Sequence, residues 1–318
     1  RLTEATRASR AYIAPHEDIE VKISAFYSKV RSPVLTDVRL EFGPGVEVFQ
    51  LYPRELPDLF QGSSLTVFGR YRGEGAVRVT LRGKVGGTPR QFEFDGRLPT
   101  RGGERNDFIP PLWASRRIGY LLDQIRLHGE DKELVDEVAR LARLYGIITP
   151  YTSHLIVEDE RGRVARHEIT AEQQTLGRTA AAAPELEKTA GAEYAGMRAQ
   201  SGAGSVPASA DVQILHQAEN VAQTRQGEER LNYKDAEGRD RNVAGQVRVV
   251  QGRSFYQEGA FWNAADVAVA KAARTKRIQF GSAEYFDLLK AKPEAATYLS
   301  VGRNVRFVLD NHLYEIHD

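Results

Sequence analysis

The feature that most constrains the fold is a set of five short segments in which apolar and polar residues alternate with a period of two. They are Val34–Phe42, Val46–Tyr52, Leu65–Tyr71, Val77–Val85 and Gln91–Asp95. Such alternation is typical of strands that bury one face. The glycine turns Gly73-Glu74-Gly75 and Gly86-Gly87 separate neighbouring runs and indicate hairpins. We predict a small antiparallel β-sandwich over residues 34–100.

A helix should precede this sandwich. Apolar residues recur at three and four positions from Ile19 to Val30, and acidic residues stand where a helix begins. The segment Arg10–Ala14 before it has the pattern of a strand. The sequence begins with neither a methionine nor a signal peptide, so we expect a fragment in which this helix lacks a partner for its apolar face.

Two helices should follow the sandwich. Pro110-Pro111 can open the first and Gly129 can end it, while Asp131 can cap the second. The short connection predicts an antiparallel helical hairpin, in which Trp113 belongs to the apolar stripe and is expected in the core. A return strand is predicted over Ile147–Val157.

The pattern weakens after residue 160. Alanine makes up about a third of residues 179–210, which predicts a disordered linker or a weakly helical stalk. After this stretch, Val212, Ile214, Leu215 and Val221 suggest a short docking segment. Strand and helix signals return near residue 246, where Ser282 can cap a helix and Trp262 is expected in a core.

These patterns predict an α+β multidomain chain of five parts. Residues 1–33 hold a strand and a helix, 34–100 the β-sandwich, 101–160 the helical hairpin and return strand, 161–242 the low-complexity linker, and 243–318 a small α+β domain.

Composition and motifs give little support to an enzyme. The 318 residues carry a net charge of +1 and contain no cysteine, so thiolate metal sites and cysteine nucleophiles are excluded and no overall field attracts nucleic acid. No apolar run is long enough for a transmembrane helix. Nucleophile-elbow, phosphate-loop, dinucleotide and zinc-protease motifs are all missing. We predict no catalytic residue, no metal ligand and no cofactor in this chain.

One basic surface is the candidate partner site. Strand alternation places two arginines on one face of a predicted strand and three cations on one face of the next, and the turn between them suggests that these strands pair. The residues are Arg70, Arg72, Arg78, Arg82 and Lys84. This face is a candidate for an anion or a protein partner, although a solvated polar face is the simpler interpretation.

Several short motifs resemble one known family. They are Leu112-Trp113-Ala114, Arg117-Ile118-Gly119, Tyr145-Gly146-Ile147 and Thr149-Pro150-Tyr151, with Ser32-Pro33-Val34-Leu35, Tyr52-Pro53 and Gly69-Arg70-Tyr71 upstream. Together they look like the segment that follows the von Willebrand factor A (VWA) domain in VIT-and-VWA proteins, which include the inter-alpha-trypsin inhibitor heavy chains and many bacterial envelope proteins. The motifs upstream are similar to the bacterial branch.

The resemblance implies that residues 1–33 are the last strand and helix of a VWA domain. The family's Asp-x-Ser-x-Ser metal loop and its Asp-Pro processing site have no counterpart here, so neither a metal ligand nor hyaluronan attachment is transferred. A divalent metal ion is implied only for the missing part of that domain.

The expected function is a non-catalytic adhesion or interaction scaffold, the C-terminal part of an extracytoplasmic protein of the periplasm or cell surface, with an unidentified protein partner. Two alternatives stay open. One is an envelope enzyme or maturation factor whose catalytic residues lie upstream. The other is a binder of anionic glycans through the basic face.

Overall fold

The computed structural model describes residues 13, 17–100, 106–149, 151, 205–224, 232–234, 240–267 and 274–318. Contacts divide the chain into two compact units, residues 1–120 with 212–220 and residues 121–211 with 221–318. Helices α3 (Ile109–His128) and α7 (Ser205–Gln217) contribute to both units. The units do not coincide with the five predicted domains, whose boundaries stay a prediction.

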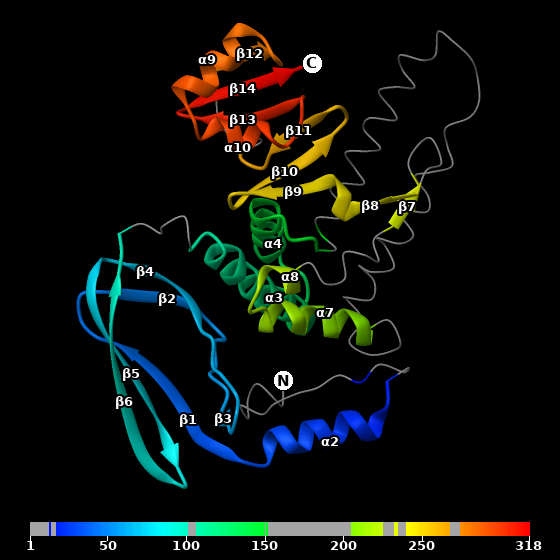
Figure 1. Ribbon diagram of the computed structural model, residues 1–318. Helices are drawn as coiled ribbons and strands as arrows, with labels where there is room; N and C mark the ends of the chain where they lie inside the picture. Colours follow the sequence, from blue (N-terminus) through cyan, green and yellow to red (C-terminus); the bar gives the residue numbers. More distant parts are fainter. Residues whose placement is uncertain are drawn as a thin grey trace. The chain divides into compact units, whose positions relative to one another are not determined.

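The first unit begins with α2 (Ile19–Val30), as the periodicity predicts (Figure 1). Asp18 caps it by accepting hydrogen bonds from the backbone N–H groups of Glu20 and Val21, at 2.9 and 3.1 Å. Of the strand predicted at Arg10–Ala14, all but Ile13 lies outside the described residues.

Two antiparallel sheets follow, so the predicted antiparallel fold is confirmed. One has the order β3-β1-β5-β6 and the other pairs β2 with β4. The strands are β1 (Pro33–Phe42), β2 (Glu47–Tyr52), β3 (Leu59–Phe60), β4 (Phe68–Arg72), β5 (Gly75–Val85) and β6 (Thr88–Leu98). Figure 1 shows β5 and β6 as one long curved hairpin. Its turn is Gly86-Gly87, as predicted, with both φ angles positive at 56° and 84°.

The second predicted hairpin is wrong. Gly73-Glu74-Gly75 connects β4 to β5, but β4 pairs with β2, whereas β5 pairs with β1 and β6. The chain changes sheet at this turn. A short glycine turn permits pairing of its flanking strands, yet the pairing is decided by which apolar faces can be buried together.

The N-terminal part of α3 anchors the first unit. Trp113 is 6% exposed, and its indole Nε1 donates a hydrogen bond to the carbonyl oxygen of Gln50 at 3.1 Å, so its predicted core position is confirmed. At Gly119, an added Cβ would lie 3.1 Å from the backbone nitrogen of His216, which shows how closely α7 approaches α3. Val212 and Leu215 of α7 are buried, in agreement with the docking segment suggested by the sequence.

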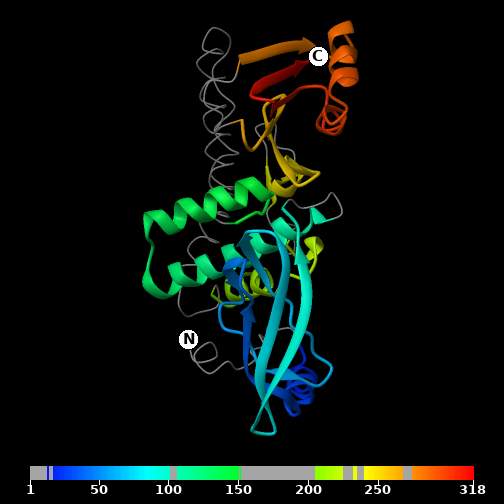
Figure 2. The same ribbon diagram turned by 90° about the vertical axis from the view of Figure 1, so that its left-hand side faces the viewer.

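The second unit contains α4 (Lys132–Tyr145), which returns after the end of α3 (Figure 2). Gly129 and Gly146 have positive φ angles and end the two helices, and Asp131 caps α4, all as predicted. The predicted return strand at Ile147–Val157 is wrong for residues 147–149, which form no strand; apart from Tyr151, which is helical, the rest lies outside the described residues.

The second unit also contains a six-stranded sheet, in the order β12-β14-β13-β11-β10-β9. Its strands are β9 (Val247–Val250), β10 (Arg253–Glu258), β11 (Phe261–Ala264), β12 (Arg274–Gln279), β13 (Val305–Leu309) and β14 (His312–His317), and its helices are α9 (Ala283–Ala291) and α10 (Ala295–Leu299). Smaller elements precede it: α8 (Val221–Thr224), β7 (Asn232–Lys234) paired with β8 (Asp240–Asn242), and the 3-10 helix η3 (Val243–Gln246).

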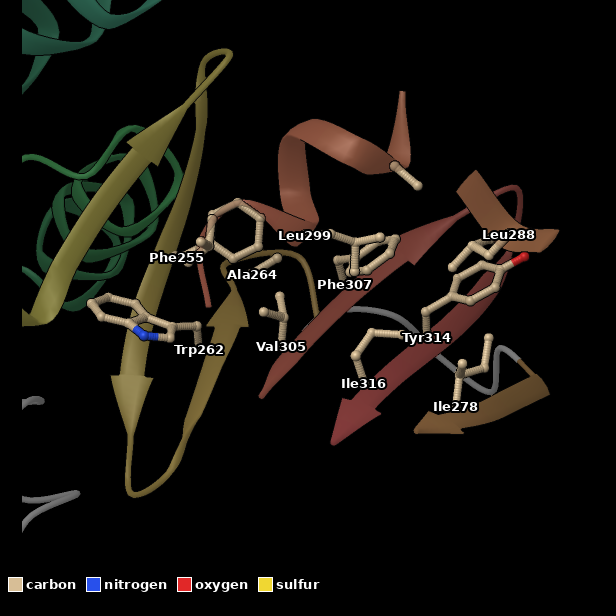
Figure 3. Packing of buried hydrophobic residues seen from close by; sticks show 12 residues of the cluster. Phe255, Trp262, Ala264, Ile278, Leu288, Leu299, Val305, Phe307, Tyr314 and Ile316 are labelled. Atoms are coloured by element: carbon tan, nitrogen blue, oxygen red, sulfur yellow. The ribbon is translucent and has the colours of Figure 1, made fainter. Parts of the chain in front are cut away.

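One apolar core holds this α+β module together. Phe255, Val305, Phe307 and Ile316 are fully buried, and Figure 3 shows them on neighbouring strands beside Trp262 and Leu299. Trp262 is 8% exposed, which confirms its predicted core position. Sequence reasoning found α9 with its Ser282 cap but missed α10, because five residues carry too little periodicity to indicate a helix.

Candidate functional site

The structure separates the five basic residues of the candidate face. Arg70 and Arg72 lie on β4, in the two-stranded sheet, whereas Arg78, Arg82 and Lys84 lie on β5, in the four-stranded sheet. The two groups therefore do not form one continuous row across paired strands. Whether either group binds an anion or a partner stays a prediction.

The cations of β5 face carboxylates on the neighbouring strands. The ion pairs are Arg78 with Asp95 at 3.0 Å and with Glu93 at 3.5 Å, Arg82 with Glu41 at 3.2 Å, and Lys84 with Asp37 at 2.7 Å. The hydrogen bond to Asp95, followed by the charges of Asp95 and Glu93, raises the pKa of Arg78 above its usual value. An anion would have to compete with these carboxylates for every one of the three cations.

The arginines of β4 contact aromatic rings. The guanidinium carbon of Arg70 lies 5.3 Å from the ring centre of Trp113 and 5.7 Å from that of Phe49. Arg72 lies 5.0 Å from the ring centre of Phe49 and pairs with Glu47 at 3.5 Å. Cation–π contacts of this kind hold Arg72 against its own sheet and Arg70 between that sheet and Trp113 of α3.

The opposite face of the β5–β6 hairpin is apolar and incompletely covered. Leu81 is directly opposite Phe92 and Val79 is opposite Phe94, so these side chains share one face. Phe92 is 44% exposed, Phe94 is 56% exposed and Val85, beside the turn, is 41% exposed. Sequence reasoning missed this surface, although alternation of Phe92 and Phe94 with polar residues was its signal.

A second apolar surface lies on α2. Ile19, Ile23 and Tyr27 are 59%, 55% and 65% exposed, and Val21 is 64% exposed. Ile19, Ile23 and Tyr27 follow the helical spacing of the predicted apolar stripe and are all exposed. Large exposed apolar surfaces of this kind mark binding sites more often than single exposed residues do.

The described residues hold no cluster of side chains suited to a metal ion. Within them, no group of three or more histidine, cysteine, aspartate or glutamate side chains is placed to hold a metal ion. The described part of the chain also contains no helix long and apolar enough to cross a membrane. Among the described residues, the apolar surfaces of α2 and of the β5–β6 hairpin are the ones that we consider for binding.

Comparison with known proteins finds partial similarity to the inter-alpha-trypsin inhibitor heavy chains, which are VIT/VWA proteins. Heavy chain H3 of Rattus norvegicus is 29% identical over 158 residues, covering 45% of this chain and 17% of the relative. Heavy chain H4 of Homo sapiens is 26% identical over 175 residues, covering 50% of this chain and 19% of the relative. Heavy chain H1 of Mesocricetus auratus is 27% identical over 158 residues, covering 46% and 17%.

The chain thus spans about a sixth of the length of the curated relatives it matches. No family model matches it, and no solved structure matches it. The similarity agrees with the resemblance that the motifs indicate, at the level of a heavy-chain-like segment.

Proposed function

We propose that the chain is a non-catalytic protein-interaction scaffold, the C-terminal part of an extracytoplasmic adhesion protein of the VIT/VWA type in a bacterial envelope. The observation that carries this proposal is the uncovered apolar surface of α2 and of the β5–β6 hairpin, where aromatic and aliphatic side chains are 41–65% exposed. Exposure of so much apolar area is unfavourable in water, and burial against a partner stabilises it by about 25 cal/mol per Å².

The partial similarity supports the same reading, because the relatives are named as heavy chains of an inhibitor rather than as enzymes. Adhesion, a bacterial origin and an extracytoplasmic location come from the motif resemblance and belong to the proposal. The partner is a protein, since the two surfaces combine apolar side chains with polar edges, as protein interfaces do.

Site-specific photocrosslinking tests the proposal. A photoreactive phenylalanine analogue replaces Phe94 or Tyr27, both of which are aromatic and more than half exposed. The control carries the analogue in place of Lys290, whose side chain is 80% exposed on α9 and pairs with Asp287. In the native host, we expect discrete protein adducts from positions 94 and 27 and none from position 290. Identical adduct patterns from all three positions would contradict a specific interaction surface.

A further inference from the structure

The four-stranded sheet of the first unit has an open edge at β6. This strand is last in the order β3-β1-β5-β6, and within the described residues it pairs only with β5. Ten of its eleven residues are exposed and the eleventh is half-buried. An exposed edge of this length is a template for pairing with another strand.

The hairpin turn determines which backbone groups face the open edge. The two-residue turn Gly86-Gly87 brings Val85 opposite Thr88, and the N–H of the residue after such a turn points to the carbonyl of the residue before it. Because these directions alternate in an antiparallel ladder, residues 89, 91, 93, 95 and 97 direct their backbone groups outward. Pro89 agrees with this register, since proline in a strand places its missing N–H toward the edge.

Strand β5, which already pairs with β6, shows which side chains fit against β6. On the apolar face, Val79 and Leu81 of β5 lie opposite Phe94 and Phe92. On the polar face, Arg78 lies opposite Asp95 and pairs with both Asp95 and Glu93. Strand β5 therefore alternates apolar with polar residues: its apolar residues lie opposite the two phenylalanines of β6, and its Arg78 meets the acidic pair of β6.

The same two rows are accessible from the open edge. Side chains of a strand project above and below the sheet, so a new neighbour would meet the same aromatic and acidic rows that β5 meets. The side chains of Glu93 and Asp95 are 48% and 79% exposed although they share one guanidinium, and Phe94 is more than half exposed. Both rows retain surface that a further strand could cover.

We propose that the open edge of β6 binds an extended segment of a partner protein in which apolar residues alternate with basic residues, adding a fifth, antiparallel strand to the sheet. This inference rests on the proposed interaction function and specifies its partner. Main-chain hydrogen bonds to the outward groups would supply affinity, and the two side-chain rows would supply specificity. A second copy of β6 is the other candidate occupant; its polar row carries Glu93 and Asp95 beside the single cation Arg97, so it offers the acidic pair fewer positive charges than a segment with several basic residues does.

A peptide with the sequence of Ala76–Val85 is the probe, because this sequence already pairs with β6. Fluorescence anisotropy measures its binding to the intact chain and to two variants, Gln91→Pro and Gln91→Ala. Proline removes an outward N–H without disturbing the pairing with β5, whereas alanine keeps it. We expect Gln91→Pro to weaken binding about tenfold, because a carbonyl of the peptide loses its N–H donor and is left without a hydrogen bond. Gln91→Ala should bind within about twofold of the original chain.

A second pair of measurements does not depend on proline. The double variant Glu93→Gln, Asp95→Asn, and separately a peptide with glutamate at its three basic positions, should each reduce binding about fivefold to tenfold. Circular dichroism and thermal unfolding check that every variant is folded. Equal binding by Gln91→Pro and Gln91→Ala, or no saturable binding of the peptide, would overturn strand addition at β6.

Sedimentation of the chain over a range of concentrations tests the other occupant. A dimer that dissociates on Gln91→Pro substitution would show that a second copy, not a basic partner strand, occupies the edge, and would also overturn the inference. The peptide could fail to bind while photocrosslinks from positions 94 and 27 are still observed. That result would contradict strand addition at β6 but would still support the proposed interaction function.

Discussion

At the scale of residues, the first unit depends on polar side chains that sequence patterns do not reveal. Arg116 is 4% exposed, and its guanidinium donates hydrogen bonds to the carbonyl oxygens of Ala218 and Thr66, at 3.3 and 2.5 Å. It also lies 4.8 Å from the ring centre of Phe68. Burial lowers its pKa, and the charge of Glu219 opposes that shift. Arginine is rarely buried, so nothing in the sequence distinguished Arg116 from a surface residue.

Trp113 gives the clearest prediction at this scale. Its ring is buried, packs edge-on at 6.5 Å from the ring centre of Tyr52 and supports Arg70, so truncation to alanine removes several contacts at once. We expect Trp113→Ala to lower the free energy of unfolding by about 3–5 kcal/mol in urea denaturation. Trp113→Phe keeps most of the volume but loses the bond to Gln50, and should cost less. A loss below about 1 kcal/mol for the alanine variant would mean that the ring is not part of the core.

At the scale of elements, the C-terminus of α4 shows how distant segments complete one another. The carbonyl oxygens of its last turn accept hydrogen bonds from β10, with Ser254 Oγ donating to Leu144 at 3.0 Å and Tyr256 OH donating to Arg143 at 2.8 Å. Helix ends leave such carbonyls without intrahelical partners. Gly146 then turns the chain with φ at 66°, where an added Cβ would lie 2.6 Å from Val249 and 2.9 Å from Ser254.

Gly146→Ala should therefore be strongly destabilising. The left-handed conformation alone costs an alanine about 1–2 kcal/mol, and the overlap with Val249 and Ser254 adds about 1–3 kcal/mol. Gly86→Ala is the matched control, because Gly86 has φ at 56° but no atom within 4 Å of an added Cβ. Thermal unfolding followed by circular dichroism should show the larger decrease for Gly146→Ala. Equal decreases for the two variants would show that the contact with β9 and β10 is absent in solution.

The basic row of β5 carries the glycan alternative, and retention on a heparin column tests it. Because Arg78, Arg82 and Lys84 each face a carboxylate at 2.7–3.5 Å, we expect weak retention that is lost by about 0.1 M salt, where screening acts over about 10 Å. The variant with serine at these three positions should elute with the original chain. Strong retention that the variant loses would support anion binding and contradict neutralisation by the ion pairs.

Sequence patterns predicted these elements better than their pairing. Alternation located most strands because the period of two is a local property of the backbone, and glycine and aspartate located the helix ends for the same reason. The partner of β4 depended instead on which faces became buried, a non-local property, and the Gly73-Glu74-Gly75 turn was consistent with either arrangement. The prediction of the candidate basic face was the least accurate, because its residues were grouped on the assumption that β4 and β5 pair.

At the scale of the whole molecule, both compact units are built from segments far apart in the chain. The first combines residues 1–120 with 212–220, and the second joins α4 to strands about 110 residues later, through Ser254 and Tyr256. Domain boundaries predicted from composition enclose continuous stretches of sequence, whereas the buried contacts within each unit join stretches that are far apart in the sequence. A docking segment could be suggested from Val212 and Leu215, but its target, the face of α3 at Gly119, could not.

Stability should be distributed unevenly over such a molecule, and hydrogen exchange measures this directly. Helix α2 has 12 residues, and none of those whose side chains the structure describes is fully buried, while an isolated helix of about 12–15 residues is marginal in water. Helix α4 has 14 residues, buries Val138, Leu141 and Ala142, and has its last carbonyls bonded to β10. We therefore expect amides of Ile19–Val30 to exchange close to the rate of an unfolded chain, and the central amides of α4 to exchange at least about a hundredfold more slowly.

Addition of a partner that covers the apolar face of α2 should slow exchange there and leave α4 unchanged. Protection of α2 equal to that of α4 in the monomer would mean that its apolar face is already buried, and would remove one of the two surfaces on which the interaction function rests.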